Sequence, residues 1–258
     1  SLAAGIGILL YGLTGPFAAA LMQSFGIRRT VTLALLLIAA ATALSTLMSA
    51  PWHYLLTWGL LSGLGTGAIA PVLGASVVNR WFVKHRGLML GLLTASTATG
   101  TLVFLPLFAV LASDYGWQSV AFTLTGLALV LAPLVWLLVP DSPAAAGLKP
   151  YGAGDDYRPP QAVSGSNAIA HAFGALGRAS KTQTFWLLFA GFFVCGLTTN
   201  GLVGTHMIAL CSERGLTELE ASGLLALMGI FDLIGTTASG WLTDRYDPRK
   251  LLFAYYGL

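Results

Sequence analysis

The stretch GWLTDRYDPRK, residues 240–250, carries five charged side chains within seven residues, although only 9% of the chain is charged. A weaker version, ALMQSFGIRR at residues 20–29, also follows a long apolar run. An offset of 221 residues superposes the two charged turns and places Arg249 over Arg28. Repeats on this scale are typical of secondary transporters, in which two homologous bundles enclose a central site. The repetition therefore predicts a duplicated bundle.

The composition indicates a membrane environment. The 258 residues are 56% hydrophobic and carry a formal net charge of +3, whereas a soluble domain is usually about 45–50% apolar and about 25% charged. A chain with so little charge can cover its surface only if much of that surface faces lipid. The sequence has no basic stripe with interleaved aromatic residues, so no nucleic-acid partner is expected.

Seven apolar runs are long enough to cross a bilayer, which takes about 20 residues. They are continuous rather than alternating, which favours helices over the strands of a barrel. The runs cover residues 3–25, 30–50, 54–78, 88–112, 118–139, 184–211 and 221–243, and an eighth begins at Leu251. The predicted fold class is an all-α membrane protein. Gly63, Gly65 and Gly67 in the third run are predicted to allow close helix packing.

One connection is long. Residues 141–182 are rich in proline, glycine, serine and charge, which predicts a mostly irregular linker between two bundles. Within the linker, Ile169, Phe173 and Leu176 have helical spacing and indicate a short helix lying on the membrane surface.

The repeat offset also predicts what flanks the chain. It places one span before residue 1 and four complete spans after the last residue, so we expect an internal piece of a twelve-span protein of about 400 residues. On this expectation, residues 1–140 form an N-terminal bundle without its first helix, and residues 183–258 begin the C-terminal bundle.

Basic residues are distributed unevenly between the two sides of the predicted bundle. When the turns are assigned alternately to two sides, twelve of the thirteen Lys and Arg residues fall on one side, and only Arg214 falls on the other. Lys and Arg collect on the cytoplasmic side of membrane proteins. Both charged turns and the linker are therefore expected to be cytoplasmic, in a multi-pass protein of the cell (inner) membrane.

The turn at 240–250 resembles the signature loop of the major facilitator superfamily, usually written G-x-x-x-D-R-x-G-R-K/R, with Asp247 where glycine is usual. The turn at 19–29 matches in part, because Gln23 replaces the acidic residue. The resemblance covers the whole chain. It implies a helical bundle of twelve spans, of which about seven are complete here and an eighth begins.

Two further stretches resemble the monocarboxylate and oxalate–formate branch of that superfamily, NRWFVKHRGLMLGL (79–92) and GIFDLIGTTASGWLTDRY (229–246). Drug–proton antiporters of the superfamily carry an arginine where this chain has Gly59, and a Gly-Pro pair where it has Gly100 followed by Thr101. Both departures argue against a drug–proton antiporter.

Asp232 is the sharpest functional signal, because a carboxylate in the middle of an apolar span costs about 2.5–3.5 kcal/mol. The functional interpretation is a cavity carboxylate that takes up a proton or pairs with a cation; the alternative is a structural hydrogen bond to a neighbouring helix. Thr236 lies one turn later, where the resembling branch often has an arginine, so anion binding by that arginine does not carry over to this chain.

Three polar residues in the run 184–211 are candidate cavity contacts, because the first span of each half lines the cavity in the superfamily. Thr199 and His206 are seven residues apart and share a helix face, and Asn200 lies about 100° away. His206 is also a candidate proton site. Polar packing between helices remains an open alternative.

The charged turns are interpreted as cytoplasmic gating loops. Asp244 ends a helix, and its carboxylate can accept hydrogen bonds from the N-terminus of the next helix and pair with nearby arginines. Such a contact would hold the bundles closed in one state and break in the other. The first turn lacks the acidic residue and is expected to hold more weakly. The residues assigned to the gating loops are Gly240, Asp244, Arg245, Arg249, Lys250, Gly26, Arg28 and Arg29.

The sequence and the resemblance together predict a monomeric secondary active transporter in the lipid bilayer. It would move a small solute, a small organic anion such as a monocarboxylate, by alternating access and with protons as a possible coupling ion. The alternatives left open are a non-transporting sensor or scaffold on the same fold and an exporter of drug-like compounds. No cofactor, metal ion or enzymatic activity is expected, because the sequence shows no nucleophile–base pair or metal-ligand cluster.

Overall fold

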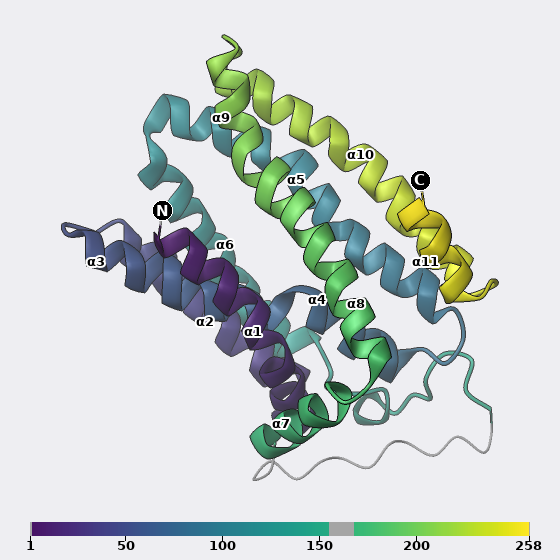
Figure 1. Cartoon of the computed structure of the whole chain (residues 1–258). Coiled ribbons are helices and arrows are strands. Elements are labelled where there is room, and N and C mark those ends of the chain that lie inside the picture. The colour runs from purple at the N-terminus through teal and green to yellow at the C-terminus, as the bar shows by residue number, and fades with distance from the viewer. Residues whose placement is uncertain (1, 155–167, 258) are drawn as a thin grey trace.

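The computed structural model describes residues 2–154 and 168–257, and in these ranges it is built almost entirely of helices (Figure 1). The elements η1 and η4 are π-helical, η2 is a 3₁₀ turn, and the others are α-helices. In order they are α1 Leu2–Phe25, α2 Ile27–Ser45, α3 Pro51–Tyr54, η1 Leu55–Leu61, α4 Ser62–Trp81, α5 Arg86–Tyr115, α6 Trp117–Leu138, η2 Ala144–Ala146, α7 Ala168–Ala179, α8 Gln183–Gly196, η4 Leu197–Gly204, α9 Thr205–Glu213, α10 Glu218–Thr243 and α11 Pro248–Gly257.

Within the described ranges, seven helical stretches are long and apolar enough to cross a bilayer. They are Leu2–Phe25, Ile27–Ser45, Pro51–Trp81, Arg86–Tyr115, Trp117–Leu138, Gln183–Glu213 and Leu219–Thr243. Each coincides with one of the seven predicted runs, and α11 forms where the eighth was predicted to begin. The predicted fold class is confirmed: the chain is a multi-pass, all-α membrane protein.

Two of these spans change their helical period along their length. The third span contains the π-helix Leu55–Leu61 and the sixth contains the π-helix Leu197–Gly204. In a π segment each hydrogen bond spans five residues in place of four, which widens the helix, and such segments are frequently found at functional sites. The second segment includes Thr199, one of the predicted cavity residues.

The predicted close packing of the third span is confirmed. A Cβ atom added at Gly63 would lie 2.8 Å from the backbone oxygen of Gly7 on α1, and one added at Gly67 would lie 2.6 Å from that of Tyr11. A Cβ at Gly65 would lie 2.8 Å from the side chain of Ile38 on α2. Small residues therefore let α4 pack backbone-to-backbone on α1, as expected for helices in lipid.

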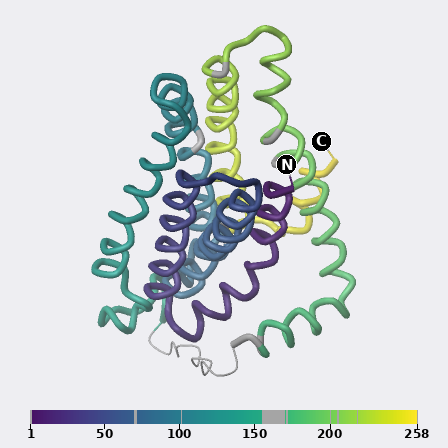
Figure 2. Tube along the Cα trace, turned by 90° about the vertical axis from the view of Figure 1, so that its left-hand side faces the viewer, coloured from purple at the N-terminus to yellow at the C-terminus, as the bar shows by residue number. Residues whose placement is uncertain are grey.

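The α1–α2 turn, the α4–α5 loop, the α10–α11 turn and α7 all lie at the same end of the bundle (Figures 1 and 2). The predicted linker helix is present as α7, and it contacts α1: the rings of Phe173 and Phe17 meet edge-on at 5.2 Å, and Ala172 packs with Ala20. Residues 155–167 of the linker, which include Arg158, lie outside the described ranges.

Candidate functional site

The longest contact between distant parts of the chain joins α5 and α10, which run antiparallel side by side (Figure 1). Glycines allow this close approach. A Cβ at Gly91 would lie 2.8 Å from the Thr236 backbone oxygen, one at Gly240 would lie 3.0 Å from Gly91 Cα, and one at Gly229 would lie 3.1 Å from the Ala98 oxygen. We call this contact the α5–α10 seam. It joins the predicted N-terminal bundle to the start of the predicted C-terminal bundle.

At the charged-turn end of the seam, the carboxylate of Asp244 caps the first turn of α5. Its Oδ1 accepts the backbone N–H of Gly87 at 2.7 Å, and its Oδ2 accepts that of Leu88 at 2.8 Å. The first N–H groups of a helix have no partner within the helix and carry its positive dipole end. The residue at the N-cap position, His85, supplies no side-chain hydrogen bond. The second half of the chain therefore supplies a cap that the first half lacks.

The partner of Asp244 differs from the one predicted. The carboxylate binds α5 and not the next helix, α11, whose first turn is capped by Asp247 through a 2.9 Å hydrogen bond from the Arg249 backbone N–H. Among the described residues, the predicted ion pair between Asp244 and an arginine is also not observed. The Arg245 guanidinium instead stacks 4.0 Å from the ring centre of Trp241. Asp247 directly precedes α11, which begins at Pro248. It is therefore better placed than Asp244 to cap that helix.

The first charged turn is held inside its own half. The N-cap residue of α2, Gly26, has no side chain, and Asp141 at the start of the linker takes its place by accepting the Arg28 backbone N–H at 2.8 Å. The Arg28 side chain in turn donates to the Val139 oxygen at 2.9 Å. The first turn is therefore also capped by a carboxylate from a distant part of the chain. Within the described residues, its hydrogen bonds join α2 to the end of α6 and do not connect the two halves.

Arg80 at the end of α4 completes this cluster. Its guanidinium donates to the backbone oxygens of Asp141 at 2.8 Å and of Met22 at 2.6 Å, and the Met22 side chain is fully buried. The ends of α1 and α4 and the start of the linker are thus held together by one half-buried side chain.

We expect Arg80→Gln to destabilise the first bundle without opening the seam, because it leaves two backbone carbonyls without their charged donor, at a cost of about 2 kcal/mol. Thermal unfolding of the full-length protein should show a lower midpoint. Arg29→Gln, an exposed position in the neighbouring turn, is the matched control and should leave the midpoint unchanged; equal midpoints for the two variants would contradict the role given to Arg80.

The linker also touches the loop that precedes α5. Tyr151 forms a short parallel bridge with Phe82: its N–H donates to the Trp81 oxygen at 2.7 Å, and its oxygen accepts the Val83 N–H at 2.8 Å. His85, in the same loop, has a φ of +58° and lies with its ring centre 6.3 Å from that of Tyr151. The linker therefore helps to fix the start of α5, where Asp244 binds.

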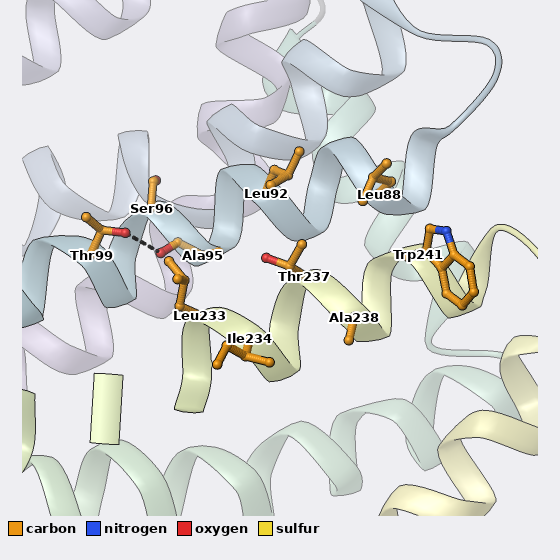
Figure 3. A pocket seen from close by; sticks show the side chains of 10 residues that line it. All are labelled: Leu88, Leu92, Ala95, Ser96, Thr99, Leu233, Ile234, Thr237, Ala238 and Trp241. Atoms are coloured by element: carbon orange, nitrogen blue, oxygen red, sulfur yellow. Dashed lines mark hydrogen bonds between the residues drawn. The ribbon is translucent and has the colours of Figure 1, made fainter. Parts of the chain in front are cut away.

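The seam has two chemically different flanks. An α-helix turns about 100° per residue, so Asp232 and Thr236 on α10 lie on the flank that Thr94 and Thr97 face from α5. The opposite flank holds a groove of about 770 Å³ (Figure 3). The groove is lined by Leu88, Leu92, Ala95, Ser96, Thr99, Leu233, Ile234, Thr237, Ala238 and Trp241.

The predicted cavity residues are only partly brought together. Asp232 and Thr236 are joined, because the Thr236 hydroxyl donates to Asp232 Oδ1 at 2.8 Å. Thr199 lies in the π segment of the sixth span and donates its hydroxyl to the Cys195 backbone oxygen. His206 is exposed on α9, and the side chain of Asn200 lies outside what the structure describes. No hydrogen bond among the described side chains links Asp232 to Thr199 or His206.

Comparison with known proteins agrees with this architecture. The family model described as Major Facilitator Superfamily matches residues 1–258. The chain is 24% identical over 257 residues to an MFS-type transporter of Bacillus subtilis, YcxA, with 98% of this chain and 58% of that protein covered. It is 28% identical to monocarboxylate transporter 13 of Bos taurus, covering 93% of this chain and 51% of that protein, and 27% identical to human monocarboxylate transporter 11, covering 94% and 48%.

The chain thus spans about half the length of the relatives it matches. The resemblance to the monocarboxylate branch, first suggested by the stretches at 79–92 and 229–246, is confirmed by these relatives. The match of the family model over the whole chain, together with seven apolar helices, shows that this chain belongs to the Major Facilitator Superfamily.

Proposed function

We propose that the protein is a secondary active transporter that moves a small organic anion, monocarboxylate-like in size and charge, by alternating access. The observation that carries this proposal is the cap of Asp244 on α5, because it is a contact between two halves that must break when the halves rock. The names of the relatives support a transporter and favour the monocarboxylate class of substrate. In this proposal residues 1–140 belong to one moving bundle, 183–258 begin the other, and 141–182 link them.

The polar flank of the seam is the proposed wall of the solute path. Intramembrane carboxylates usually face a bundle interior or a water-filled cavity, and Asp232 shares its flank with three threonines. Asp232 is the proposed proton site, with Thr236 as its hydrogen-bond donor. Thr199, Asn200 and His206 would approach from the sixth span, where the π segment widens the helix.

The charged turns are the proposed cytoplasmic gate, and the conformation described here is the one in which this gate is closed. Gly240 and Asp244 form its contact surface with α5. Arg28, Arg29 and Gly26 belong to the first turn, which the Asp141 cluster holds within its own bundle. At the far end of the seam, aromatic, aliphatic and small side chains line a cavity of about 310 Å³; Trp58, Trp117 and Ser222 are among them.

Transport is tested with the full-length protein in sealed vesicles. Saturable uptake of a radiolabelled monocarboxylate, accelerated by an inward proton gradient, is the expected result. Saturable binding without flux would instead favour a sensor or scaffold on the same fold, and flux of apolar cations in place of anions would favour an exporter of drug-like compounds.

We expect Asp244→Asn to shift the protein toward the inward-open state. The amide keeps one acceptor oxygen but loses the second acceptor and the negative charge at the helix N-terminus, worth about 1 kcal/mol or roughly a fivefold change in the closed-to-open ratio. The measurement is labelling of a Thr94→Cys reporter by an impermeant maleimide from the cytoplasmic side, with Cys195 and Cys211 replaced by serine.

Asp247→Asn is the matched control for this experiment. It removes the same charge from the same turn but affects the cap of α11 and not that of α5. Reporter labelling that rises equally in both variants, or in neither, would show that the carboxylate of Asp244 does not hold the gate.

A further inference from the structure

The groove on the apolar flank of the seam has no role in the proposed solute path. It lies on the side of α5 and α10 opposite Asp232 and Thr236. Its lining is dominated by aliphatic side chains, and the hydroxyls of Ser96 and Thr99 are bonded to backbone oxygens of their own helix at 2.6 and 3.3 Å. A mainly aliphatic flank of this kind, on which Thr237 supplies the remaining hydroxyl, is suited to lipid more than to water.

The groove has the length of one leaflet. It runs along α5 from Leu88, beside the charged turn, to Thr99, and along α10 from Trp241 to Leu233 (Figure 3). Eleven residue steps of an α-helix span about 16 Å, and half of a bilayer's hydrocarbon core is about 15 Å thick. One extended acyl chain of the adjacent leaflet would therefore fill the groove from its mouth to the midplane.

The mouth of the groove carries a positive charge at headgroup depth. The Arg245 guanidinium is stacked over Trp241, which forms the end wall of the groove. The neighbouring carboxylate of Asp244 is engaged by the first turn of α5. Tryptophan is favoured at membrane interfaces, and basic residues at the cytoplasmic surface attract anionic lipids.

We propose that this groove binds one acyl chain of an anionic phospholipid from the cytoplasmic leaflet, with the lipid phosphate at Arg245. The walls of the site come from α5 and α10, so the lipid contacts both halves at once. It fits the groove only while the seam is closed.

A ligand that binds one conformation better than another shifts the equilibrium toward it. Anionic lipid therefore favours the closed cytoplasmic gate. This consequence rests on the proposed transport function, whereas the binding itself does not.

Binding is tested by photocrosslinking, which needs no flux. The full-length protein is placed in phosphatidylcholine nanodiscs with a trace of phosphatidylglycerol or phosphatidylcholine that carries a diazirine in its acyl chain, and labelled peptides are identified by mass spectrometry. We expect the phosphatidylglycerol probe to label residues 88–99 and 233–241 about fivefold more than the phosphatidylcholine probe, the ratio that one basic residue near an anionic surface supplies.

Two sets of variants separate recognition of the lipid headgroup from binding of its acyl chain. Arg245→Gln should abolish the headgroup preference and Arg245→Lys should retain most of it, while Arg249→Gln, which removes the same charge from the same turn, should leave it intact. Ala238→Phe fills the groove and should reduce labelling by both probes, whereas Leu227→Phe, at an exposed position of α10 outside the groove, should not.

Equal labelling by the two probes, a preference that survives Arg245→Gln, or labelling unaffected by Ala238→Phe would each overturn the lipid site. None of these results depends on whether the protein transports a solute, so a failure of the lipid site is distinguishable from a failure of the proposed function.

Discussion

Replacing Gly91 with leucine is expected to keep the seam from closing. A Cβ at this position would already lie 2.8 Å from the Thr236 backbone oxygen and 3.2 Å from Gly240 Cα. Both are backbone atoms, so no side-chain rotation can relieve the overlap. Overpacking typically costs about 1–3 kcal/mol, and the helices would have to separate to avoid it. Separation would also break the hydrogen bonds from Gly87 and Leu88 to Asp244, so the closed state should be lost and transport with it.

The test combines monocarboxylate uptake with cytoplasmic labelling of the Thr94→Cys reporter. Gly100→Leu on α5 is the matched control, because a Cβ at that position would meet no atom within 4 Å. Reporter labelling should rise and flux should vanish in Gly91→Leu alone. A protected reporter in that variant would mean that the seam is not the moving interface.

The spans and the small-residue packing were predictable because their signals are local. Each of the seven apolar runs forms a helical span, and Gly63 and Gly67 indicated that another helix packs closely on the third span. The identity of those neighbours, Gly7 and Tyr11, depends on how distant helices meet. No spacing within the third span contains that information.

The caps at the charged turns show the same limit. The carboxylate of Asp244 was correctly expected at a helix N-terminus, but the wrong helix was assigned, because the nearest helix in sequence already has a local cap in Asp247. Asp141 was missed entirely, since its partner at Arg28 lies 113 residues away. A usable signal did exist: the N-cap residues of α2 and α5 are Gly26 and His85, neither of which supplies a capping side chain, so a distant acceptor had room to bind at each.

The π segments could not have been predicted. The stretch LTTNGLVG at 197–204 holds two threonines, an asparagine and two glycines, but a similarly small and polar stretch, TASTATGT at 94–101, is α-helical within α5. Whether a span adopts π-type hydrogen bonds depends on how it packs against the other helices, so the segment becomes visible only in the folded chain.

Asp232→Asn is expected to abolish proton-driven uptake while leaving the protein assembled. The Thr236 hydroxyl donates to Asp232 Oδ1 at 2.8 Å, and an asparagine can keep that acceptor oxygen in place. What it loses is the group that can bind and release a proton. Accumulation against a concentration gradient under an imposed proton gradient should therefore disappear. Exchange of labelled for unlabelled substrate, which needs no net proton movement, should persist.

Thr236→Val separates this interpretation from the structural one. The variant removes the hydrogen bond but keeps the carboxylate, so a proton site should still couple. If Asp232 instead serves only to join α10 to a neighbouring helix, Asp232→Asn should lower thermal stability without uncoupling uptake from the gradient, and Thr236→Val, which alters a hydrogen bond within α10, should do neither. Uptake that remains proton-driven in Asp232→Asn would remove this carboxylate from the coupling mechanism, because no other acidic residue lies in the middle of a described span.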